Sequence, residues 1–301
     1  MVLKECAKKK LMITGITFLI FLFTMFCPTI EKPISSSFSF PEGNITPIYL
    51  LNQSSYVSRT EMMLKSEQTL PLVKEIVSVL TIDSKDSIYI PSIFAPVLPA
   101  QTKLLSMDLQ GTTLKLNFDK TFLSVPKSQY HKMLECLVYS LTEIDGVENI
   151  LIYVEGELLR KDPYTSELLS IPLSREMGVN TMYALDQLSG SMKTTAYYLA
   201  KENQYTYYIP VTFVQSENKE KVEVIIEELK SRPHLNTNLI SYLHANAELE
   251  NYELLEQEVK LSFNDYFYEG LFSEDMIEEV KYSIALSMKD SLHVKAVTFL
   301  P

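Results

Sequence analysis

An internal repeat is the feature of this sequence that most restricts its fold. The run LKLNF at Leu114–Phe118 has a counterpart, VKLSF at Val259–Phe263, that begins 145 positions later. LIYVEG at Leu151–Gly156 and AVTFLP at Ala296–Pro301 are separated by the same interval. In LKLNF and VKLSF, apolar and polar residues alternate, and the apolar residues stand at corresponding positions of the two runs. This pattern predicts two strands that are each buried on one face. Two copies of one small domain are therefore expected.

Helical patterns repeat in step with these strands. Each copy has one apolar stripe at helical spacing before its hairpin and another after it, the later ones with Ser128 and Ser273 as predicted N-caps. The stripes are Val73, Ile76, Val77, Leu80 and Tyr130, Met133, Leu134, Leu137, Val138, Leu141 in copy one, and Val222, Ile225, Ile226, Leu229 and Met276, Ile277, Val280, Ile284, Met288 in copy two. Agreement in order, facing and spacing favours a duplication.

The order of these elements predicts an α/β (α+β) fold. Each copy reads as strands, a helix, a hairpin, a second helix and a closing strand, and the first hairpin turns at Gln110-Gly111. Helices separated by a hairpin are expected to pack on one face of a small mixed sheet. Residues 45–188 are predicted to be the first domain with its connector, and residues 189–301 the second. A chain of 301 residues is long enough for both.

The N-terminus predicts passage across a membrane. Lys8, Lys9 and Lys10 precede an uninterrupted apolar run, Leu11–Phe26, and basic flanking residues stay on the cytoplasmic side. Residues 1–27 are therefore predicted to be a signal or anchor segment at the cell membrane, with the bulk of the chain extracytoplasmic. An uncleaved anchor helix is favoured, and a cleaved signal peptide or a lipid anchor at Cys27 are the alternatives. Residues 28–44, rich in Pro and Ser, are expected to be a tether.

Charge and composition argue against several classes of function. The net charge of -11 disfavours binding to the phosphate backbone of nucleic acids. The four histidines are scattered, and the three cysteines lack a metal-binding spacing. Four acidic residues near turns are interpreted as solvated surface charges: Asp108, Asp119, Glu143 and Asp145. No catalytic residue, cofactor-binding residue or metal ligand is predicted.

A tyrosine-rich strand is the candidate interaction surface. The run YTYYIPVTF contains Tyr205, Tyr207 and Tyr208, in a chain with 18 Tyr and no Trp. Neighbouring residues of a strand point to opposite faces, so Tyr207 and Tyr208 cannot both face the same side. Tyrosine combines apolar area with a hydrogen-bonding tip, which suits protein interfaces. Core packing is the favoured alternative for these side chains.

Two stretches of the first copy carry a family resemblance. TKLLSMDLQGTTLKLNFDKTFL and LVYSLTEIDGVENILIYVEGELL resemble the GerMN domain of sporulation and spore-germination proteins, through Leu141-Thr142-Glu143, Gly146-Val147 and Glu155-Gly156. The resemblance covers about residues 45–175 well, and residues 193–301 weakly. In the second copy, Glu256, Ser291 and Pro301 stand where the first has glycines. The matching residues are structural, so the resemblance transfers no catalytic or ligand-binding residue.

The resemblance implies a role in endospore formation or germination. Tandem GerMN domains behind an N-terminal anchor are typical of GerM-type proteins. The implied function is that of a non-catalytic, membrane-anchored assembly factor that binds other envelope or sporulation proteins. A module that binds a cell-envelope ligand such as peptidoglycan is the alternative.

Overall fold

The computed structural model describes residues 36–39, 45–183, 191–216, 219–231, 239–269, 271 and 273–300. The predicted anchor segment, most of the predicted tether and the predicted domain boundary at residues 188–191 lie largely or wholly outside these ranges. Within the described ranges, no helix has the length and apolar character needed to cross a membrane.

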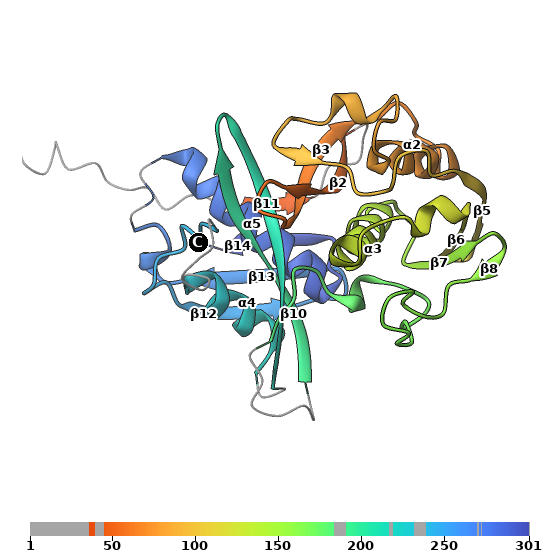
Figure 1. Cartoon of the computed structure of the whole chain (residues 1–301). Helices are drawn as coiled ribbons and strands as arrows, with labels where there is room; N and C mark the ends of the chain where they lie inside the picture. Colours follow the sequence, from red (N-terminus) through yellow and green to blue (C-terminus); the bar gives the residue numbers. More distant parts are fainter. Residues whose placement is uncertain are drawn as a thin grey trace, which may run out of the picture. The chain divides into compact units, whose positions relative to one another are not determined.

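The first domain contains every element that the repeat predicts (Figure 1). Its main elements are β2 (Ile45–Asn52), β3 (Val57–Met63), α2 (Thr69–Leu80), β5 (Leu104–Gln110), β6 (Thr113–Phe118), α3 (Lys127–Leu141) and β7 (Asn149–Val154). The shorter ones are η1 (Ser87–Tyr89), β4 (Phe94–Ala95), η2 (Lys120–Leu123) and β8 (Glu157–Leu158). A connector follows, with η3 (Arg175–Met177) and β9 (Met182–Tyr183).

The second domain repeats this order. It consists of β10 (Ser191–Glu202), β11 (Tyr205–Ser216), α4 (Lys221–Lys230), β12 (Leu249–Leu254), β13 (Glu258–Phe263), η4 (Asp265–Phe267), α5 (Glu274–Leu292) and β14 (Ala296–Leu300). Ser273 caps α5 as predicted, since its side chain accepts a hydrogen bond from the Met276 amide. The prediction for Ser128 is wrong: Pro126 is the N-cap of α3 and Ser128 lies inside the first turn. Pro126 has an extended backbone there, and it lacks an N–H that would need a partner at the helix start.

The strands of each domain are divided between two sheets. One sheet per domain holds its later strands, in the orders β5-β6-β7-β8 and β12-β13-β14-β1. The early hairpins of both domains join in a third sheet, β10-β11-β3-β2-β4, with β9 alongside β11. This division differs from the single sheet expected for each domain. The early hairpins are buried on both faces, as the run Ala196–Ala200 shows, and strands of that kind need cover on two sides.

One strand comes from the stretch predicted to be a tether. β1 (Ser36–Ser39) pairs antiparallel with β14, from Ser36 opposite Phe299 to Ser39 opposite Ala296. In the first domain, β8 pairs antiparallel with β7 in the corresponding place. β1 therefore covers an edge of the second domain's sheet, and covered edges resist pairing with foreign strands.

The long helices hold the shared sheet in the same way in both domains. α3 packs on β2 and α5 packs on β10. The hydroxyl of Ser140 in α3 accepts a hydrogen bond from the Tyr49 amide at 2.9 Å, and that of Ser287 in α5 accepts one from the Tyr197 amide at 2.9 Å. Residues Ser36–Leu300 consequently form one compact unit.

Candidate functional site: the polar cluster between the domains

The two domains meet first through their early hairpins. β11 pairs antiparallel with β3, where Tyr208 lies opposite Arg59. The Tyr208 ring packs edge-on against Tyr282 of α5, with 5.1 Å between ring centroids. The Tyr282 hydroxyl in turn donates a hydrogen bond to Glu61 on β3 at 3.0 Å. Backbone pairing and side chains thus join the first domain to the second.

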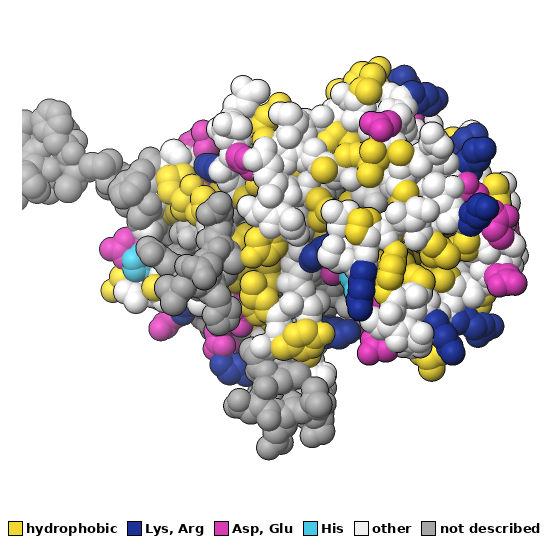
Figure 2. Space-filling view, viewed as in Figure 1, with side chains coloured by type: hydrophobic (Ala, Val, Ile, Leu, Met, Phe, Trp, Pro, Cys, Tyr) yellow, Lys and Arg dark blue, Asp and Glu magenta, His cyan; other side chains and the backbone are white. Residues whose placement is uncertain are grey.

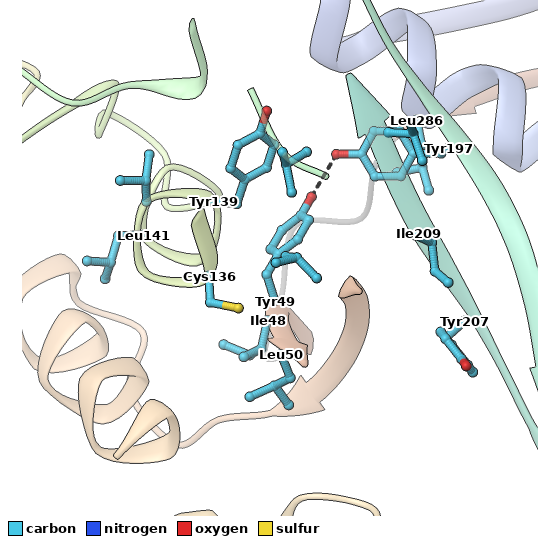
Figure 3. Close-up of a cluster of buried hydrophobic side chains, with 14 of the residues drawn as sticks. Ile48, Tyr49, Leu50, Cys136, Tyr139, Leu141, Tyr197, Tyr207, Ile209 and Leu286 are labelled. Atoms are coloured by element: carbon cyan, nitrogen blue, oxygen red, sulfur yellow. Dashed lines mark hydrogen bonds between the residues drawn. The ribbon is translucent and has the colours of Figure 1, made fainter. Parts of the chain in front are cut away.

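Two buried tyrosines form the centre of the contact. The hydroxyls of Tyr49 on β2 and Tyr197 on β10 lie 2.9 Å apart (Figure 3). Tyr49 donates to Glu143, just after α3, at 2.9 Å, and the Tyr197 hydroxyl lies 3.2 Å from Asp290 in the last turn of α5. Each tyrosine lies on the first strand of its domain's early hairpin, and each carboxylate lies at the C-terminal end of that domain's later helix. A tyrosine–carboxylate pair from one domain thus faces such a pair from the other.

Arg175 of the connector links the two carboxylates. Its guanidinium donates to Glu143 at 2.6 Å and to Asp290 at 2.7 Å. It also donates to the Tyr139 carbonyl at 3.1 Å and the Thr142 hydroxyl at 2.9 Å, and it lies 4.7 Å from the centre of the Tyr139 ring. The fixed fork of an arginine suits two carboxylates that must be held in one geometry. Arg175 therefore fastens the first domain to the second.

The charges of this cluster balance. Lys289 of α5 donates to the second oxygen of Glu143 at 3.0 Å, so two cations face two carboxylates. Burial alone would raise the pKa of the Glu143 carboxyl, but Arg175 and Lys289 outweigh it and hold that pKa well below its usual value. Burial raises the pKa of the Tyr49 and Tyr197 hydroxyls. Glu143 is accordingly an ionised, fully paired group and a poor candidate for a general base.

Asn180 is a second residue of the connector that bridges the domains. Its side-chain amide donates to the Val57 carbonyl of β3 at 2.8 Å and to the Pro210 carbonyl of β11 at 2.7 Å. Its oxygen accepts from the Val57 amide at 3.0 Å. The connector is thus a structural part of the contact between the domains.

Acid should weaken this cluster. Because the pKa of Glu143 is depressed in the folded chain, its contribution is complete above the pKa of the unfolded chain and is lost as the pH falls through the folded value. We expect the free energy of unfolding to fall below about pH 4.3, and to fall less in Glu143→Gln. Urea unfolding at stepwise pH values measures this. Glu253→Gln, at an exposed ion pair, is the control, and equal slopes for both variants would contradict the prediction.

The three tyrosines of the candidate interaction surface lie on β11. Tyr207 is only 5% exposed and packs edge-on against Phe94 at 5.0 Å, while Tyr205 and Tyr208 are half-buried against the core. Core packing, the favoured alternative, is confirmed for Tyr207. Tyr208 serves the contact between the domains. An outside partner at this strand stays a prediction, and the structure leaves part of Tyr205 accessible for it.

The acidic residues considered from the sequence are not brought together. Asp108 and Asp145 are exposed, and the Asp119 carboxylate accepts a hydrogen bond from the Lys103 backbone amide at 3.0 Å. The interpretation of Glu143 as a solvated surface charge is wrong, since its side chain is 4% exposed in the cluster. Cys136 is buried in α3, and burial raises the pKa of its thiol. No group of three potential metal ligands occurs among the described residues.

No pattern in the sequence indicates the Arg175 cluster as a whole. Arg175 lies in a connector without periodicity, and nothing local distinguishes it from a surface arginine. The repeat does not reveal the pair either, because in the register of 145 positions Asp290 corresponds to Asp145 and Glu143 corresponds to Met288.

Comparisons with known proteins agree with this architecture. The family model described as "Germane: Sporulation and spore germination" matches residues 47–160. The spore germination protein GerM of Bacillus subtilis is 26% identical over 258 residues, which cover 83% of this chain and 69% of that protein. The solved tandem GerMN domains of the sporulation protein GerM from Bacillus subtilis superpose with a TM-score of 0.76 at 24% identity, over 85% of this chain and 90% of theirs. Residues 47–160 therefore match the domain family of sporulation and spore germination, and the chain as a whole has the fold of two GerMN domains in tandem.

Proposed function

We propose that this protein is a non-catalytic assembly factor of endospore formation or germination, anchored in the membrane by its N-terminal segment. The observation that carries the proposal is the fixed attachment of one GerMN-type domain to the other through a shared sheet and the Arg175 cluster. Two domains held in one geometry present two binding surfaces at a set distance. Binding at one surface then favours binding at the other through effective concentration.

The outer strands β5 and β12 are the surfaces best suited to partners. Each lies at an edge of its sheet, without a partner strand among the described residues. Both strands are interrupted by a bulge, at Leu105 in β5 and at Glu250 in β12. Leu105 is 49% exposed and apolar, whereas Glu250 is exposed and acidic. The same position of the repeat thus offers different chemistry, which favours two different protein partners.

The surface around β5 is rich in charged side chains. Charged side chains of both signs gather over the end of the first domain that holds β5 to β8 (Figure 2). An apolar residue surrounded by charged ones is a common composition for a protein interface, with an apolar centre and a polar rim.

Spore yield tests the proposal. A strain that produces only Leu105→Lys or Glu250→Lys should lose most of its mature spores, because a lysine placed against an apolar or basic partner costs about 2 kcal/mol or more of binding. Ile88→Lys changes an apolar residue outside the edge strands that is more exposed than Leu105, and it should leave the yield unchanged. Full yield from both edge variants, at normal protein levels, would refute binding through these edges.

The alternative function is binding to the cell wall. Full spore yield from Leu105→Lys and Glu250→Lys, together with recovery of both purified variants on isolated peptidoglycan, would favour that alternative. Crosslinking of distinct proteins through residues 105 and 250 in sporulating cells would favour assembly.

Topology follows from the basic cluster before the apolar run. We expect a reporter that is active only in the cytoplasm to be silent when fused after Pro301, and one that requires export to be active. The opposite pattern would place the domains in the cytoplasm. Labelled palmitate incorporated in wild type and absent in Cys27→Ser would establish the lipid anchor instead of the uncleaved helix.

A further inference from the structure

A cavity of about 530 Å³ opens in the first domain, away from β5 and β12. Its walls come from three segments that are distant in the sequence. They are the turn before β3, one face of α3, and the connector around Gly178. A cavity of this volume matches the sites that hold small molecules in other proteins.

The polar floor of the cavity is neutral overall. Lys132 and Glu135 of α3 form an ion pair at 3.0 Å, and Lys132 also donates to Asn180 at 2.8 Å. Glu135 is nine-tenths buried. One of its carboxylate oxygens accepts hydrogen bonds from the Lys132 ammonium and from the backbone N–H of Asn180. Neither the second carboxylate oxygen nor the third proton of the ammonium has a partner within the described structure. A free acceptor thus lies beside a free donor.

The rim of the cavity is apolar. Met177, Met182 and Tyr183 line it, and the Tyr183 ring is 76% exposed. Gly178 shapes this wall: its φ is +80°, and a Cβ there would lie 2.9 Å from the Thr181 hydroxyl. The connector therefore turns tightly and brings both methionines to the same opening.

We infer that this cavity is a binding site for a neutral saccharide. A sugar hydroxyl is both donor and acceptor, so one hydroxyl can donate to Glu135 while it accepts from Lys132. An ion would be disfavoured, because the floor carries no net charge to compensate it. The exposed ring of Tyr183 can cover the apolar face of a sugar ring, and the methionines fill the remaining apolar surface. Binding here does not depend on the edge strands of the proposed function.

Methionine methyl resonances test the site in the full chain. With ¹³C-methyl methionine and the chain in detergent, we expect the disaccharide of N-acetylglucosamine, or cellobiose, to shift the Met177 and Met182 signals saturably. Met63, on the exposed end of β3, should not move. Tyr183→Ala should weaken binding about three- to tenfold, and Lys132→Met should abolish the shifts.

Matched variants separate loss of binding from loss of folding. Tyr183 is exposed, so its replacement should not change the melting temperature, and Tyr89→Ala removes another exposed tyrosine as its control. Lys74→Met is the control for Lys132→Met, since Lys74 is exposed on α2. Saccharide binding at this site is overturned if no sugar shifts the two methionines, if the dipeptide Ala-Ala shifts them as strongly, or if Tyr183→Ala leaves the affinity unchanged. None of these outcomes alters the expected effect of Leu105→Lys on spores.

Discussion

Replacing Arg175 with methionine is expected to lower the free energy of unfolding by about 3–5 kcal/mol, the usual cost of removing one partner from a buried ion pair. The loss arises because, among the described residues, Asp290 then keeps its contact with Tyr197 alone, whereas Glu143 keeps Lys289 and Tyr49. Methionine preserves much of the length and apolar contact of the arginine stem. Urea unfolding followed by circular dichroism measures the change.

Arg160→Met provides the matched control for this variant. Arg160 is exposed, so its replacement should change the free energy of unfolding by less than about 0.5 kcal/mol. A double-mutant cycle of Arg175→Met with Asp290→Asn isolates the coupling across the domains. A coupling near zero, or equal effects of Arg175→Met and Arg160→Met, would mean that Arg175 does not fasten the domains.

Replacing Phe118 with aspartate is expected to abolish cooperative unfolding of the chain. Phe118 on β6 is fully buried and stacks on Phe122 at 4.6 Å. Loss of a buried phenylalanine ring costs about 3–5 kcal/mol, and the carboxylate adds the cost of an unpaired buried charge. Together these approach the whole stability of an ordinary domain. Near-ultraviolet circular dichroism during thermal unfolding reports the outcome.

Phe263→Asp, at the same position of the repeat, should be milder. Phe263 on β13 is half-buried, although it stacks on Phe267 at 4.5 Å. A carboxylate there can reach water, so much of the charge penalty is avoided. If Phe118→Asp and Phe263→Asp lowered the free energy of unfolding equally, the prediction that burial of the phenylalanine sets the loss would be wrong.

The elements of each domain could be predicted because they depend on local periodicity. Strands such as β6 and β13 have their apolar residues fixed by alternation, and α3 and α5 by helical spacing. Because the sequence is duplicated, an element predicted in one copy could be compared with the pattern at the corresponding place in the other copy. The start of α3 differs from the prediction because Ser128 fits the preference for an N-cap, whereas the helix begins after Pro126, which makes no side-chain cap hydrogen bond.

The division of strands among sheets could not be predicted in the same way. Burial of β10 on both faces is visible in its apolar run, but the identity of the strand beside β11 depends on how two domains dock. That docking is decided by single contacts such as Tyr208 opposite Arg59, which leave no periodic trace in the sequence. The same reason hides Arg175, whose partners Glu143 and Asp290 are 32 and 115 positions away along the chain.

If the chain is held at a membrane as proposed, the pairing of β1 with β14 has a mechanical consequence. Tension applied through the residues before Ser36 reaches the hydrogen bonds between β1 and β14 before it reaches β2. While those bonds hold, the load is borne by the second domain, and the first domain is shielded from it. Once they open from the Ser36 end, the load moves to β2 and so to the first domain. The force at which the β1–β14 hydrogen bonds open would then limit how far the domains can be drawn from the membrane.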